Sequence, residues 1–139
     1  MKMLFDTNVI LDVLIEREPF YLYSARCMAS VEERKTEGWI CSTTVTTIAY
    51  LLRKELTSEN ASKHIESLLT LFDISTVHKK VFIEALHNGF TDYEDSVLAE
   101  SAVVNNLEGI ITRNKKDFKA SKLPVYTPKE FLAILSQIQ

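Results

Sequence analysis

This sequence of 139 residues has few of the residues that interrupt regular structure, since it contains three glycines and three prolines. That scarcity excludes a low-complexity or largely disordered chain, and 46% hydrophobic with 25% charged residues is the composition of an ordinary globular domain. The two cysteines, Cys27 and Cys41, have no metal-type spacing. We therefore expect both to be small apolar core residues of a protein in a reducing compartment.

Long apolar runs are also missing. No stretch approaches the roughly 20 residues that span a bilayer, and the N-terminus lacks the apolar segment and cleavage site of a signal peptide. These absences predict a cytoplasmic protein with no membrane contact. A net charge of −3 argues against a protein that coats nucleic acid nonspecifically. The length is that of one typical domain, so we expect residues 1–139 to form a single domain.

The first twelve residues organise the rest of the chain. Met3 to Phe5 form a short apolar run, Asp6-Thr7-Asn8 interrupts it, and apolar residues then resume at helical spacing. We interpret this as a strand, an acidic turn and a helix. A carboxylate at the C-terminal end of a central parallel strand lies where open α/β sheets bind ligands, so Asp6 is the first candidate site residue. The alternative is that Asp6 only caps the following helix.

Farther along, the sequence alternates between strand and helix patterns, which predicts an α/β fold with a parallel sheet and helices on both faces. The expected strands are Met3–Phe5, Trp39–Cys41, Ile74–Val77, Gly109–Thr112 and Pro124–Tyr126. The expected helices are Val9–Ile15, Phe20–Glu37 with Gly38 as its stop, Thr43–Glu55, Ser58–Phe72, Lys79–Asn88, Asp92–Leu107 and one that begins at Pro128.

Several further polar residues follow strands or begin helices on this scaffold. Asp92, Glu94 and Asp95 stand at the start of a helix, and Asn114 and Asp117 follow the fourth strand. Because strand C-termini and helix N-termini share one edge of a parallel sheet, these groups can converge there with Asp6. Such an oxygen-rich site suits Mg²⁺ or Mn²⁺. The alternative for each acid alone is a helix-dipole or surface role.

Between Arg113 and Lys122 five basic residues accompany one acid, so this stretch carries +4 and the remainder −7. Most such charge runs are solvated surface. Here they border the acids, where they can contact the phosphate groups of a ligand. The basic residues we expect to do so are Arg113, Lys115, Lys116 and Lys119.

Four stretches together resemble the PIN-domain family, most closely its small bacterial members similar to VapC-type toxins. They are Phe5–Asp12, Asp92–Leu98, Ile111–Phe118 and Pro124–Leu132, in the family's order and spacing. The resemblance implies a three-layer α/β/α fold with a central parallel sheet. It also implies a Mg²⁺- or Mn²⁺-dependent endoribonuclease, whose ion would activate water and stabilise charge on the phosphate.

Carried over residue by residue, the resemblance makes Asp6 and Asp95 direct metal ligands. Asn114 stands where the family often has Asp, and Asp117 is expected to supply the missing charge as a third metal ligand, with Asp92 as a further catalytic acid. Many members also have a Glu where Thr47 stands, and no acid occurs between Gly38 and Glu55. The residues expected around these ligands, orienting carboxylates or a water, are Thr7, Asn8, Thr47, Glu94, Thr112 and Asn114.

The resemblance further implies a homodimer and a small antitoxin protein that wraps the site, which would make the chain the toxin of a type II toxin–antitoxin system. Because Thr47 and Asn114 replace usual acids, a noncatalytic or weakly active PIN-like RNA-binding or regulatory protein is the alternative. A phosphotransfer receiver or a haloacid-dehalogenase-like phosphatase is a third class. The first needs a second acid beside its phosphoacceptor and the second needs Asp-x-Asp, and Asp6-Thr7-Asn8 departs from both.

Overall fold

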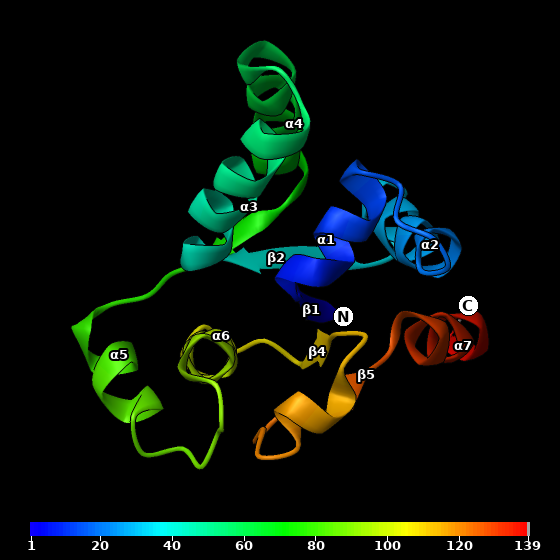
Figure 1. Cartoon of the computed structure of the whole chain (residues 1–139). Helices are drawn as coiled ribbons and strands as arrows, with labels where there is room; N and C mark the ends of the chain where they lie inside the picture. The colour runs from blue at the N-terminus through cyan, green and yellow to red at the C-terminus, as the bar shows by residue number, and fades with distance from the viewer. Residues whose placement is uncertain (139) are drawn as a thin grey trace.

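The computed structural model describes residues 1–138, and its elements alternate along the chain as the sequence predicts (Figure 1). Their bounds are β1 Lys2–Phe5, α1 Thr7–Leu14, α2 Tyr21–Glu32, β2 Glu37–Cys41, α3 Ser42–Glu55, α4 Ser58–Leu71, β3 Asp73–Ser75, α5 Lys79–Ala85, α6 Tyr93–Val104, β4 Gly109–Ile111, the 3₁₀ helix η1 Lys115–Phe118, β5 Val125–Tyr126 and α7 Pro128–Ile138.

The strands of residues 1–138 form one sheet in the order β3-β2-β1-β4-β5, and every pairing in it is parallel. β1 is central, because Met3 pairs with Gly38 of β2 on one side and with Gly109 of β4 on the other. A parallel sheet needs a crossover between successive strands, and the intervening helices provide it. The predicted α/β fold is confirmed.

Helices cover both faces of the sheet, which gives the three layers. On one face, Met3, Phe5 and Ile111 pack in a core with residues of α1, α2, α3, α4 and α7. On the other, Leu4 and Ile110 pack against α6 and Phe118 of η1. Alternate residues of a strand point to opposite faces, so β1 serves both cores. Figure 1 shows α3 beside α4, and α5 beside α6, as pairs of contacting helices.

One predicted boundary is wrong. The helix expected over 20–37 ends at Glu32, and the chain turns at Arg34, which has a left-handed φ of 60°. Gly38 is no helix stop, because it lies within β2. A Cβ there would lie 2.7 Å from the Phe72 ring and 2.9 Å from Val31, so only glycine fits without a shift of these neighbours.

The third strand is also displaced from its expected position, since it begins at Asp73 and ends at Ser75. Cys27 and Cys41 are buried and unpaired, as expected. Among residues 1–138 we find no helix with the length and apolar character needed to cross a bilayer.

Candidate active site

The candidate site lies where the chain reverses its direction of travel across the sheet. From β1 the chain adds β2 and β3 on one side and only later β4 and β5 on the other. Open α/β sheets bind ligands outside the carboxyl ends of their strands at such a switch point. Asp6 directly follows β1 and its N–H donates to the carbonyl of Ile111, the last residue of β4, at 2.9 Å. The ends of β1 and β4 are therefore joined where the first candidate acid stands.

Asp6 occupies the N-cap position of α1, but its side chain makes no capping hydrogen bond. Its carboxylate instead accepts the hydroxyl of Thr112, which follows β4, at 2.8 Å. Asp6 is 5% exposed. Burial raises the pKa of this carboxyl, and the Thr112 hydroxyl, the Thr7 backbone N–H and the charge of Arg113 act against that rise, whereas Glu94 adds to it. The carboxylate thus faces the strand ends, and capping is not its role.

The start of α6 supplies the second group of acids. Asp92 is the N-cap of this helix, and its carboxylate accepts the backbone N–H of Asp95 at 2.9 Å. Part of its bonding capacity therefore serves the helix. The pKa of Asp95 rises to about 7, first because of burial and then because of the negative charges of Asp6, Asp92, Asp117 and Glu94, in that order. Acids from three separate segments have gathered around one carboxylate.

A surface hollow of about 300 Å³ lies among these elements. Thr47 of α3 lines it, and its hydroxyl donates to the Thr43 carbonyl at 3.1 Å. Thr47 therefore stands in the hollow, where the resemblance places an acid. The residues that line this hollow are Asp6, Thr7, Asn8, Leu11, Thr47, Leu51, Asp92, Glu94, Asp95 and Leu98.

A second hollow, of about 370 Å³, shares Asp92 and Asp95 with the first. Asp117 of η1 lines it, together with Lys116 and Lys119. This arrangement brings the acids of α6 and η1 beside two exposed ammonium groups. Cations that flank an acidic hollow are suited to bind phosphate groups of a nucleic-acid backbone that crosses the hollow.

The other two basic residues are engaged elsewhere. Lys115 forms an ion pair with Glu130 of α7 at 3.1 Å. The Nε atom of Arg113 lies 3.1 Å from Asp12, and its guanidinium stacks on the Phe20 ring at 4.0 Å. Of the four cations expected at the site, Lys116 and Lys119 are therefore the two that face the acids.

The remaining polar residues support the strand ends. Thr7 shares a hydrogen bond of 3.0 Å with Thr44, which ties α1 to α3. The backbone N–H of Asn114 donates to the Thr112 hydroxyl at 3.1 Å, so Thr112 links Asn114 to Asp6. Thr44 was not predicted, and its place within a Ser-Thr-Thr run gives no hint that its partner lies on α1.

The donor set fits a hard divalent cation. Carboxylate oxygens that raise one another's pKa are stabilised by positive charge, and Mg²⁺ is commonly held by one or two carboxylates with water and substrate oxygens. Residues 1–138 hold no group of three or more acidic, histidine or cysteine side chains arranged around one metal position. The expected ligands Asp6, Asp95 and Asp117 are thus not gathered around one point, since Asp6 shares one hollow with Asp95 and Asp117 shares the other.

Sequence reasoning missed Asp12. This residue of α1 is fully buried, and its carboxylate lies between the guanidinium groups of Arg17 and Arg113. The position of this acid inside the apolar run Val9 to Leu14 could have indicated a buried ion pair, because a charge on a buried helix face needs a partner.

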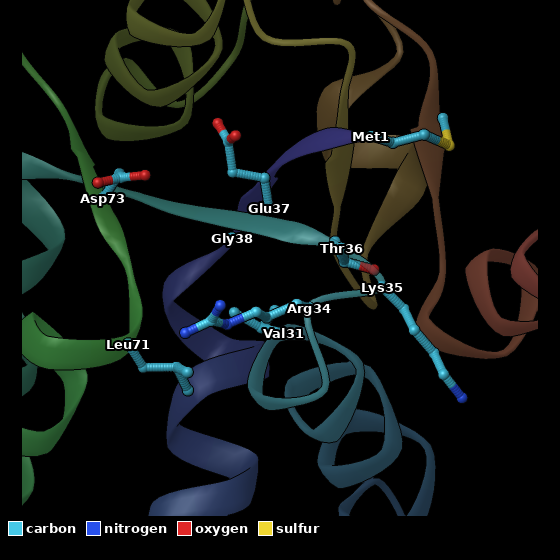
Figure 2. Close-up of a pocket in the computed structure, with 9 residues that line it drawn as sticks. All are labelled: Met1, Val31, Arg34, Lys35, Thr36, Glu37, Gly38, Leu71 and Asp73. Atoms are coloured by element: carbon cyan, nitrogen blue, oxygen red, sulfur yellow. The ribbon is translucent and has the colours of Figure 1, made fainter.

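A further pocket, of about 370 Å³, lies at the opposite edge of the sheet, where β2 and β3 begin. Figure 2 shows its charged side chains diverging, with Glu37 on one side of β2, Arg34 on the other and Lys35 pointing away from both. No converging set of acids lines it, so the two hollows around Asp95 remain the candidate site.

Comparison with known proteins identifies the family of the chain. The family model for the PIN domain matches residues 2–116. Ribonuclease VapC1 of Aquifex aeolicus (strain VF5) is 27% identical over 137 residues, covering 94% of this chain and 92% of that protein.

Solved structures share the fold. The structure of VapBC-1 from nontypeable Haemophilus influenzae superposes with a TM-score of 0.69 at 17% identity, covering 93% of this chain and 99% of that one. A toxin–antitoxin complex from Klebsiella pneumoniae gives 0.67 at 23% identity, covering 91% and 97%.

Proposed function

The chain belongs to the PIN-domain family, and on that premise we propose that it is a divalent-metal-dependent endoribonuclease and the toxin of a toxin–antitoxin pair. The observation that carries the proposal is that Asp95 lines two adjoining hollows at the switch point of the sheet, one shared with Asp6, Asp92 and Glu94 and the other with Asp92 and Asp117. The similarity to Ribonuclease VapC1 supports RNA as the substrate.

In this proposal Asp6 and Asp95 hold Mg²⁺ or Mn²⁺, with Asp117 on the opposite side of Asp95. When bound, the ion supplies Lewis-acid activation of water and stabilises negative charge on the scissile phosphate. Thr112 keeps the Asp6 carboxylate turned toward the hollow through its hydrogen bond. Asp92 holds the first turn of α6, and thereby the position of Asp95, through its bond to the Asp95 N–H.

Lys116 and Lys119 are the proposed phosphate contacts, because they line the hollow that contains Asp95 and Asp117. Each contact would release counterions from the RNA, which makes binding salt-dependent. Lysine is suited to this task as a point charge that follows a flexible backbone.

The fold neighbours include toxin–antitoxin complexes, which supports a small antitoxin protein as a partner. A homodimer and a cytoplasmic location complete the proposal. Gel filtration with light scattering tests the dimer, because a strict monomer at micromolar concentration would contradict it.

Cleavage of RNA in the presence of Mg²⁺ or Mn²⁺ tests the activity. We expect wild-type protein to cut, EDTA to abolish cutting, and Asp6→Asn and Asp95→Asn each to reduce the rate at least a hundredfold. Asp73→Asn is the matched control, because Asp73 is an exposed acid at the opposite edge of the sheet. Full activity in both site variants would refute the proposed site.

A noncatalytic RNA-binding protein of the same family is the second candidate. It is favoured by Thr47, which lines the hollow without a carboxylate, and by Asn114 after β4. Under this reading the protein binds RNA with no metal-dependent cleavage, and Asp6→Asn leaves RNA affinity unchanged or increased. The cleavage assay with wild-type protein therefore separates the two candidates.

A further inference from the structure

We infer that Asp12 is a positioning residue for the active site, which holds the segment after β4 in place through an ion pair with Arg113. This inference deepens the proposed nuclease function and depends on it for its consequence, although not for its geometry. The segment in question, residues 112–117, contains Thr112, which binds the Asp6 carboxylate, and Asp117, which lines the second hollow.

The contacts come from three parts of the chain. Asp12 lies on α1, with Oδ2 at 3.1 Å from Nε of Arg113 and Oδ1 at 3.4 Å from Nε of Arg17. The opposite contact of the Arg113 guanidinium is the Phe20 ring at 4.0 Å. The arginine is thus held between a carboxylate and an aromatic face.

The burial of Asp12 makes this arrangement specific. Its carboxylate has no exposed surface, and neither of its oxygens accepts a geometrically acceptable hydrogen bond within residues 1–138. The two guanidinium groups are therefore its only compensation there. Buried ion pairs are weak contributors to stability, because desolvation offsets their attraction, yet they fix the position of the groups that form them. The pair is better explained by placement than by stability.

Arg113 transmits that placement through the backbone. Thr112, one residue before it, binds the Asp6 carboxylate, and Asn114, one residue after it, donates its N–H to the Thr112 hydroxyl. The Asn114 carbonyl in turn accepts the N–H of Asp117 at 3.0 Å. A guanidinium locked against α1 therefore restricts the one segment that carries these three side chains.

The pair also determines where the charge of Arg113 acts. A free guanidinium next to Asp6 would neutralise the carboxylates that are proposed to bind a cation. Asp12 supplies a counter-charge and holds Arg113 beside Phe20, from where the charge of Arg113 lowers the pKa of Asp6 against the larger effect of burial. We therefore assign Arg113 to positioning, in place of the phosphate contact expected from the sequence.

The test uses amide hydrogen exchange of the full chain in the absence of metal, so it does not depend on activity. In Asp12→Asn we expect exchange at Asn114 and Asp117 to quicken at least tenfold, with exchange at Phe72, on the far side of β2, unchanged. Arg17→Gln is the matched control, since it removes the other guanidinium on Asp12 without touching residues 112–117. It should leave exchange at Asn114 and Asp117 within twofold of the wild type.

Arg113→Lys provides a second variant if Asp12→Asn does not fold, because it keeps the charge and loses the planar group that stacks on Phe20. It should quicken the same two amides. Unchanged exchange at Asn114 and Asp117 in the folded variants, or equal acceleration at Phe72, would overturn the inference.

Mn²⁺ titration by calorimetry tests whether Asp12 also affects the metal affinity of the proposed site. Outer residues that orient metal ligands typically change affinity by ten- to a hundredfold, so the Mn²⁺ dissociation constant should rise about tenfold in Asp12→Asn and remain near wild type in Arg17→Gln. Absence of Mn²⁺ binding by the wild type would refute the proposed nuclease, while the exchange data would still decide the role of Asp12.

Discussion

Replacing Asp95 with Asn should stabilise the metal-free protein, and the gain should grow with pH. The change removes one negative charge from a carboxylate whose pKa is raised to about 7 by burial and four neighbouring acids. Its shape is nearly preserved, and the backbone N–H that Asp92 caps is retained. The prediction therefore measures the cost of a negative charge at this position, from burial first and from the neighbouring acids second.

The sign and size of this difference in unfolding free energy follow from the linkage between proton binding and folding. The folded pKa of Asp95 lies above its ordinary value of 3.8, so between about pH 4 and pH 7 the folded state binds more protons than the unfolded state. Stability of the wild type therefore falls as pH rises through this window. The full shift corresponds to about 4 kcal/mol. Because Asp95 is partly exposed and solvent screens its neighbours, we expect about 1–2 kcal/mol at pH 8.

Urea denaturation in EDTA at pH 4.5 and pH 8 measures this difference for both proteins. The advantage of Asp95→Asn should be small at pH 4.5 and reach its full size at pH 8, equivalent to a rise of roughly 3–6 °C in Tm for a chain of this length. Saturating Mn²⁺ should reverse the order, since ligand at a hundred times its Kd stabilises the folded state by about 2.7 kcal/mol. Equal stability of the two proteins at pH 8, or a less stable variant, would refute a raised pKa for the Asp95 carboxyl.

Three further predictions test neighbouring parts of the molecule. Thr47→Glu adds a carboxylate to the hollow beside Asp6. It should tighten Mn²⁺ binding about tenfold in calorimetry and lower the Tm of the metal-free protein. Weaker Mn²⁺ binding would contradict this geometry. Gly38→Ala places a Cβ against Phe72 and should cost about 1–3 kcal/mol of unfolding free energy in urea, whereas a neutral effect would show that this contact is loose. Lys116→Gln and Lys119→Gln should each weaken RNA binding and reduce its salt slope by about one in filter-binding assays, and an unchanged slope would remove them from the interface.

Much of the fold was predictable because strand and helix leave different local periodicities. Each expected strand and helix exists, and their alternation implied the parallel sheet. The end of α2 was not predictable in the same way. Glu33, Arg34 and Lys35 are acceptable helix residues, so nothing local stops the helix before Gly38. The pairing of Glu37 with Lys2 of β1 ends it, and that pairing is a long-range event.

Part of the candidate site was likewise predictable from the sequence, and part of it was not. Asp6 and Asp95 could be placed together from sequence, because strand ends and helix starts share one edge of a parallel sheet. In the structure both residues line the same hollow. The ion pair between Asp12 and Arg113 joins residues about a hundred positions apart. No sequence motif specifies which basic residue forms an ion pair with a buried acid. Side-chain partners of that kind required the folded structure.

The distribution of charge explains why a basic segment can adjoin an acidic site without cancelling it. Residues 113–122 carry +4, yet Arg113 pairs with Asp12, which it shares with Arg17, and Lys115 pairs with Glu130. Both of these basic residues thus have carboxylate partners that line neither hollow. Lys116 and Lys119 remain on the rim beside Asp117, where a polyanion could reach them. The acids around Asp95 consequently retain their mutual repulsion, and that unrelieved repulsion is what gives a divalent cation a favourable place in the proposed nuclease.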